Sequence, residues 1–177
     1  MNPAGTGRPP AGPLFQTCRS VLRQVDRVSW LFVVAAMAGM TTLIVAQVFF
    51  RYALSNSIDW AEEFARLFFV WAIFLAIPHG IKTGIHVGID VVVVMFSARI
   101  REILFRVGAV LGAVLMAIVF YYSWVVTLDT WPELMPTVDV TASVYYIAVL
   151  VAAGHSFLHL TLLTLGGSHT WDEESVS

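Results

Sequence analysis

The chain has 177 residues, of which 58% are hydrophobic and only 12% are charged, whereas a soluble domain usually carries about 25% charged residues. The net charge of −2 and the lack of a basic arm argue against a nucleic-acid partner. Cys18 is the single cysteine, which excludes an internal disulfide and a redox-active thiol pair. Nearly uncharged stretches of about 20 residues match the length needed to cross a bilayer, so these features predict one membrane domain.

The N-terminal region combines a polar tail with a basic segment. Residues 1–13 are rich in glycine and proline and are predicted to form a disordered tail. Residues 14–27 place apolar side chains at helical spacing, with Arg19, Arg23 and Arg27 on another face, which predicts a basic amphipathic helix running directly into the first span. The arginines form an ordinary solvated face or anchor the helix on anionic lipid headgroups, at about 1 kcal/mol per basic residue, and the two interpretations are compatible.

Four long apolar segments account for most of the remaining chain. The spans are predicted at residues 28–52, 59–81, 102–128 and 140–165. The first of them is too long for a signal-peptide core, which has about 7–15 apolar residues, so cleavage is not expected. The fold class predicted is an all-α membrane protein of four transmembrane helices.

Two further segments flank these spans. Residues 85–97 form an apolar stretch that is too short for a confident span, and their valine run taken alone suggests a strand. Because an open strand edge is not tolerated in lipid, we expect a helix lying in the membrane interface instead. Residues 167–177 are polar and acidic and are predicted to form a disordered tail.

The distribution of basic residues predicts the orientation, because cytoplasmic loops of membrane proteins carry an excess of lysine and arginine. An even number of spans places the N-terminal region and the connection after the second span on one side. Eight basic residues fall there, namely Arg8, Arg19, Arg23, Arg27, Lys82, Arg99, Arg101 and Arg106. Arg51 lies on the other side, and Arg66 lies inside the second span. Both termini are therefore predicted to be cytoplasmic.

Charged residues cluster at the start of the second span. Glu62 and Arg66 are spaced i, i+4 and Glu63 and Arg66 are spaced i, i+3, so Arg66 can be neutralised on its own helix, while Arg51 can reach the same carboxylates across the turn. The cluster either fixes the first hairpin or fastens the chain to a membrane partner. A proton or ion relay is disfavoured, because it would need polar groups continuing through the bilayer and residues 67–77 offer none.

Small residues recur at helical spacing in the last two spans. Gly108 and Gly112 form a G-x-x-x-G pair, and Ala148, Ala152 and Ser156 repeat the same spacing. Such faces let helix backbones approach closely, within this chain or against another.

Three histidines suggest alternative sites. His79 and His155 lie at similar predicted depths and can be imagined as axial ligands of a b-type haem, although nothing else in the sequence points to electron transfer. A zinc site at His155 and His159 is disfavoured because no acidic residue is expected nearby. The sequence contains no recognisable nucleophile–base pair or phosphate-binding loop, so we expect no enzyme activity, no catalytic residue, no metal and no cofactor.

From residue 25 to residue 165, the order of motifs resembles the DctQ-like small membrane subunits of tripartite ATP-independent periplasmic (TRAP) transporters. The matching motifs are Q-V-F-F-R-Y (47–52), W-A-E-E-F-A-R (60–66), W-A-I-F-L (71–75) and G-I-H-V-G-I-D (84–90), then a proline-containing loop followed by Tyr145 and Tyr146. Departures from the family pattern are Ala76 and Pro78, where small residues such as glycine are usual, and Asp139.

The resemblance implies a role in a three-part system of the bacterial inner membrane. A periplasmic solute-binding protein captures an organic anion, a large membrane subunit carries it inward with sodium, and the small, non-catalytic subunit braces the scaffold of the large one. Residues implied in subunit contact or scaffold organisation are Arg51, Asp59, Trp60, Glu62, Glu63, Arg66, Trp71, His86 and Asp90. The alternatives are a small haem-b electron-transfer protein and a stand-alone membrane scaffold.

Overall fold

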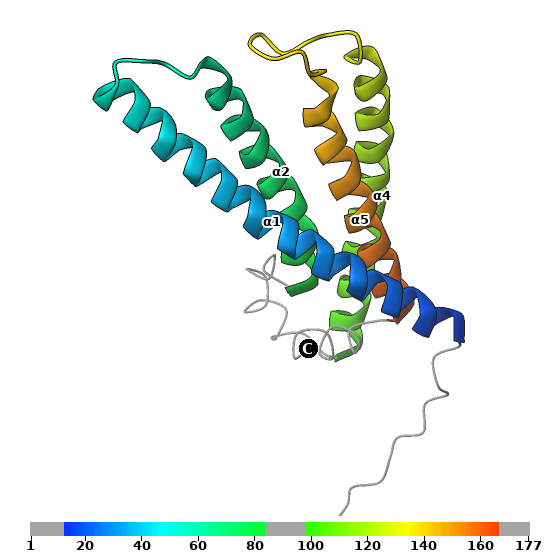
Figure 1. Ribbon diagram of the computed structural model, residues 1–177. Coiled ribbons are helices and arrows are strands. Elements are labelled where there is room, and N and C mark those ends of the chain that lie inside the picture. Colours follow the sequence, from blue (N-terminus) through cyan, green and yellow to red (C-terminus); the bar gives the residue numbers. More distant parts are fainter. Residues whose placement is uncertain (1–12, 84–97, 167–177) are drawn as a thin grey trace, which may run out of the picture.

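The computed structural model describes residues 13–83 and 98–166, and these form four α-helices (Figure 1). The helices are α1 (Pro13–Ala53), α2 (Asp59–Thr83), α4 (Ala98–Asp129) and α5 (Ser143–Gly166). Each contains a stretch long and apolar enough to cross a membrane: Ser20–Ala53, Asp59–Ile81, Ile103–Asp129 and Ser143–Thr164. The predicted all-helical, four-span architecture is confirmed. The two tails and the proposed interfacial segment 85–97 lie outside the described residues.

Helix α1 contains both the predicted basic segment and the first span in one continuous element of 41 residues. It ends in a turn in which the Asn56 N–H donates to the Phe50 carbonyl oxygen at 3.1 Å, while Ser55 adopts a left-handed backbone with φ of 50°. This arrangement satisfies carbonyl groups that a helix end leaves unpaired. It also returns the chain within a few residues to the start of α2.

The helices form two antiparallel hairpins, α1–α2 and α4–α5, which pack through α2 and α5. The hairpins meet where α1 begins and α5 ends, and we call this the terminal end (Figure 1). They diverge toward the connections within each hairpin, residues 54–58 and 130–142, and we call this the loop end. Helix α1 is strongly inclined and passes across α5 near the terminal end. The connection between α4 and α5 leans over toward the first turns of α2.

Small side chains allow the helices to approach closely. The α1–α2 contact centres on Val33, Ala36, Ala72 and Leu75, with Phe68 and Trp71 packed against them. On α5, all three positions of the predicted small-residue face are buried, namely Ala148, Ala152 and Ser156. This face therefore packs inside the chain, as close helix contacts in membranes require.

The two glycines of the G-x-x-x-G pair in α4 have different surroundings. A Cβ added at Gly112 would lie 3.2 Å from the Leu160 side chain of α5, so this glycine serves the α4–α5 contact. A Cβ added at Gly108 would meet nothing within 4 Å. Only one member of the pair is therefore used in packing within the described residues.

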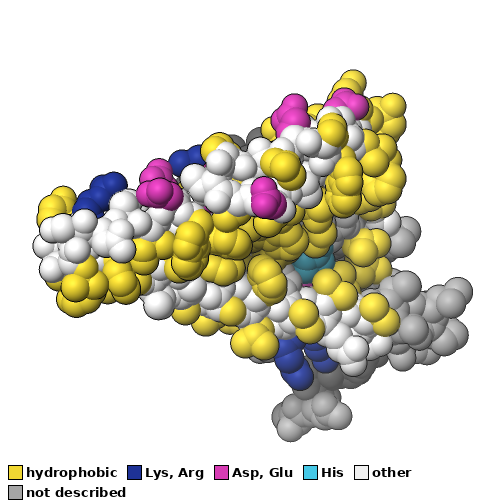
Figure 2. Space-filling view, turned by 45° about the horizontal axis from the view of Figure 1, so that its top comes forward, with side chains coloured by type: hydrophobic (Ala, Val, Ile, Leu, Met, Phe, Trp, Pro, Cys, Tyr) yellow, Lys and Arg dark blue, Asp and Glu magenta, His cyan; other side chains and the backbone are white. Residues whose placement is uncertain are grey.

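The flanks of the molecule are apolar. Figure 2 shows hydrophobic side chains covering them, with acidic side chains along the loop end. In the most apolar stretch of α4, only 6% of the residues are buried. An apolar exterior of this extent belongs in lipid or against another membrane protein, since soluble proteins rarely expose such patches.

Candidate functional site

The charged cluster at the loop end begins with an ion pair on the surface of α2. Arg66 donates to Glu62 at 3.3 Å across one helical turn, and both side chains are more than half exposed. The predicted i, i+4 pair is therefore confirmed. Arg51 is exposed and makes no ion pair with either glutamate of α2 within the described residues.

Glu63, the next residue along α2, is turned toward the α4–α5 connection instead. Its side chain is buried, and its Oε2 accepts hydrogen bonds from the Thr137 hydroxyl at 2.7 Å and the Thr137 backbone N–H at 3.2 Å. Of the two glutamates that could neutralise Arg66, Glu63 is instead bound to the connection between α4 and α5, whose donors compensate the burial of its carboxylate. A carboxylate can be buried only when such donors compensate its desolvation.

Two more hydrogen bonds join α2 to the start of α5. The Trp71 indole N–H donates to the Val144 carbonyl oxygen at 3.1 Å, and the Tyr145 hydroxyl donates to the Glu63 carbonyl oxygen at 3.4 Å. Trp71 and Glu63 thus connect the two hairpins within this chain. We refer to the Glu63–Thr137, Trp71–Val144 and Tyr145–Glu63 contacts together as the hairpin bridge.

Other predicted site residues of α2 remain on the surface. The Asp59 carboxylate accepts a hydrogen bond from the Ser57 hydroxyl at 3.0 Å. Trp60 is 47% exposed, and its ring and that of Phe64 meet edge to face. These side chains, together with Arg51 and the Glu62–Arg66 pair, are available to a partner at the loop end.

Several other predicted residues belong to the terminal end. Arg23 and Arg27 are exposed on α1, as a headgroup anchor requires. Arg19 lies in the first turns of the same helix, but its side chain is outside the described part of the structure. His86 and Asp90 also lie outside the described residues.

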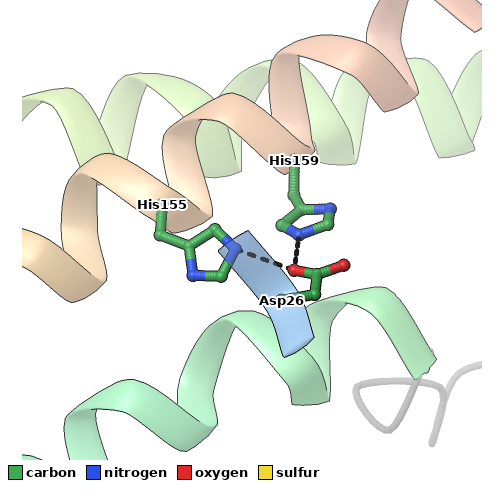
Figure 3. A group of neighbouring side chains, drawn as sticks. All are labelled: Asp26, His155 and His159. Carbon is green, nitrogen blue, oxygen red and sulfur yellow. Dashed lines mark hydrogen bonds and ion pairs between the residues drawn. The ribbon is translucent and has the colours of Figure 1, made fainter. Parts of the chain in front are cut away.

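A second cluster, buried near the terminal end, was not predicted. The Asp26 Oδ1 atom of α1 lies 2.8 Å from Nε2 of His155 and 2.8 Å from Nε2 of His159, both on α5 (Figure 3). The exposed fractions of the three side chains are 9%, 4% and 2%, respectively. We call these three residues the Asp26–histidine cluster. It is a polar centre inside the junction of the two hairpins.

The expectation that no acidic residue lies near the two histidines is therefore wrong. Asp26 is the only acidic residue in the first 58 positions, and it falls in a buried stripe of α1 that includes Leu22, Ser29 and Val33. A charged residue at core spacing within a span usually has a partner and a function. That position in the stripe is the sequence signal that identifies Asp26 as more than part of the basic face.

The histidine geometry does not favour the haem alternative. The rings of His79 and His155 meet edge to face with centroids 6.1 Å apart, and the rings of Trp30 and His79 also meet edge to face, with centroids 5.6 Å apart. His155 is also hydrogen-bonded through its Nε2 atom to Asp26. These contacts describe packed side chains joined in a polar network.

Comparison with known proteins identifies the family. The model of the DctQ component of tripartite ATP-independent periplasmic transporters matches residues 40–167, which include all of α2, α4 and α5. The chain belongs to the DctQ family. The family resemblance drawn from the motifs of α1 and α2 is thereby confirmed, and DctQ proteins are transport components.

Individual relatives agree with this assignment. A putative TRAP transporter small permease protein of Haemophilus influenzae is 23% identical over 75% of this chain and 81% of its own length. The C4-dicarboxylate TRAP transporter small permease protein DctQ of Vibrio cholerae is 31% identical over 44% of this chain, and the match covers 34% of that relative.

One relative is a much longer protein. The isethionate TRAP transporter permease protein DctMQ of Oleidesulfovibrio alaskensis is 27% identical over 70% of this chain, but the match covers only 21% of that relative. A DctQ-like region is therefore one part of that larger permease chain.

Proposed function

We propose that this DctQ-family chain is the small, non-catalytic subunit of a sodium-coupled TRAP transporter for an organic anion. In this role it packs beside a large permease subunit and braces its scaffold, while a periplasmic protein delivers the solute. The family match over residues 40–167 is the observation that carries the proposal. The named solutes of its relatives, C4-dicarboxylates and isethionate, are organic anions, which supports the substrate class.

The apolar exterior supports a scaffold role. The described helices bury little of their surface against one another. Among these helices, α4 packs extensively only against α5. A large permease subunit would cover part of this apolar surface and lipid the rest. Helix packing in membranes rests on such close contacts, since lipid supplies no hydrophobic driving force between helices.

We place both termini in the cytoplasm and the loop end on the periplasmic side of a bacterial inner membrane. The start of α1, the end of α2, the start of α4 and the end of α5 all lie at the terminal end. The first three of these helix ends carry or adjoin the basic residues. The excess of arginine and lysine there is what cytoplasmic regions carry. Arg23 and Arg27 would then contact anionic headgroups of the cytoplasmic leaflet.

We assign different roles to two groups of residues at the loop end, the buried hairpin bridge and an exposed charged group. The hairpin bridge, including Glu63 and Trp71, would organise the shape of the subunit from inside. The exposed group of Arg51, Asp59, Trp60 and the Glu62–Arg66 pair would contact the large subunit or the periplasmic protein. Because the ion pair is exposed, its loss should leave the fold of this chain nearly unchanged.

Solute uptake by cells tests the proposal. The gene for this chain is deleted and restored as wild type, as Arg66→Ala or as a matched Arg27→Ala control, and uptake of radiolabelled C4-dicarboxylate and isethionate is measured with and without sodium. We expect uptake to require the chain and sodium, and to fall at least several-fold in R66A but not in R27A. Sodium-dependent uptake of organic anions that is unchanged by the deletion would refute the proposal.

A further inference from the structure

The Asp26–histidine cluster gathers three potential metal ligands at one point. The Asp26 carboxylate oxygen and the Nε2 atoms of His155 and His159 all lie within 4.8 Å of one another. The close-up shows both imidazole rings turned toward the same carboxylate oxygen of Asp26 (Figure 3). Nitrogen and carboxylate oxygen are the donors that zinc and similar divalent ions accept.

The distances suit an ion with little rearrangement. Zinc holds these donors at about 2.0–2.2 Å, which separates two donors of a tetrahedral ion by about 3.3 Å. The two observed oxygen–nitrogen distances of 2.8 Å are shorter by about half an ångström, and the two histidine nitrogens lie within 4.8 Å of each other, so side-chain rotations must lengthen the first two separations while bringing all three donors around one ion. Rotations of this size are within the ordinary freedom of histidine and aspartate side chains.

The sequence spacing agrees with this chemistry. His155 and His159 are four residues apart on α5 and therefore lie on one face of the helix. Zinc enzymes with an H-E-x-x-H helix use this spacing for two ligands and the intervening glutamate as a general base. Ser156 stands in the place of that glutamate, so the arrangement keeps the ligand spacing and lacks the base.

We propose that Asp26, His155 and His159 form a binding site for a divalent transition-metal ion, with zinc as the representative occupant. The ligands come from α1 and α5, so the ion would cross-link the two hairpins at the terminal end. Three protein ligands leave a fourth position for water. The site has a structural purpose, and it is independent of the transport role proposed above.

Metal titration of the purified full-length chain in mild detergent tests this proposal. After chelator treatment, the protein is titrated with zinc chloride by calorimetry and with cobalt chloride by visible absorption, which distinguishes tetrahedral from octahedral cobalt. The variants are Asp26→Asn and the double change His155→Gln with His159→Gln, and Asp59→Asn is the matched control, because it removes an exposed carboxylate of α2.

We expect one equivalent of each metal to bind the wild type and D59N, with the cobalt spectrum of a tetrahedral site. Loss of a residue that only orients a metal ligand weakens metal binding by about 10–100-fold. Loss of a direct ligand in D26N should therefore weaken metal binding by at least about 100-fold. Circular dichroism and size-exclusion profiles establish that the variants remain folded.

The wild-type titration keeps the test decisive even if the variants misfold. Wild-type protein that binds no stoichiometric metal, or that shows only the octahedral cobalt spectrum of the buffer, would overturn the proposal. The cluster would then be a hydrogen-bonded network between the hairpins alone. Equal affinity in folded D26N and wild type would overturn it as well.

Discussion

The hydrogen bonds between Glu63 and Thr137 give the sharpest prediction about how the hairpins are held together. Thr137→Val keeps the size and branching of the side chain and preserves the backbone N–H that donates to Glu63 at 3.2 Å. It removes only the hydroxyl that donates at 2.7 Å. The change therefore isolates one contact between the α4–α5 connection and α2.

The expected cost follows from the surroundings of the two groups. A hydrogen bond to a charged group contributes about 1.5–3 kcal/mol. Thr137 is exposed while Glu63 is buried, so water can replace part of the lost interaction. We therefore expect T137V to lower the free energy of unfolding by about 1–1.5 kcal/mol, at or just below the lower limit of that range.

The assay is equilibrium unfolding of the purified chain in mixed detergent micelles, followed by tryptophan fluorescence. Thr161→Val is the matched control, because the Thr161 hydroxyl donates at 2.8 Å to a carbonyl of its own helix and joins no other element. The control should cost less than about 0.5 kcal/mol. In a double-mutant cycle with Glu63→Gln, T137V should show a coupling energy of about 1 kcal/mol.

Two results would refute this reasoning. The first is an unfolding free energy for T137V equal to that of T161V. The second is strict additivity between T137V and E63Q, because two groups that interact directly cannot be independent.

Three further substitutions concern individual polar side chains and use the same assay. Trp71→Phe removes the indole N–H that donates to α5 at 3.1 Å, so it should cost about 1 kcal/mol; the exposed Trp60→Phe is its control, and equal effects would argue against the bond. Ser143→Ala removes a buried hydroxyl that donates to a carbonyl of α4 at 2.8 Å and should cost about 1 kcal/mol. Ser156→Ala removes a buried hydroxyl with no hydrogen-bond partner within the described residues, so it should leave stability unchanged or raise it; a loss matching that of S143A would contradict this.

The sequence was sufficient for features that depend on one helix at a time. The four spans were predicted from runs of apolar residues, and the predicted limits of the second span, 59–81, coincide with the observed apolar stretch Asp59–Ile81. The Glu62–Arg66 pair follows from helical geometry alone, and so does the small-residue face of α5. The family resemblance rested on motif order, which also needs no tertiary information.

The contacts between hairpins could not be predicted in the same way. Glu63 has a suitable cation three residues away on its own helix, yet its partner is Thr137, which is 74 residues distant in sequence. Asp26 is separated from His155 by 129 residues. Such pairings depend on how α1 and α2 pack against α5, and the residue pattern of a single sequence carries no record of that packing. The helical spacing of Asp26 with Leu22, Ser29 and Val33, away from the arginines, is the one local signal in the sequence.

Affinity purification of this chain from native membranes in mild detergent tests the central claim, that it is the small subunit of a larger permease. We predict a stoichiometric complex with a much larger membrane protein, retained in T137V and weakened in R66A. A wild-type chain that elutes alone and monodisperse from membranes active in sodium-dependent uptake of organic anions would contradict it.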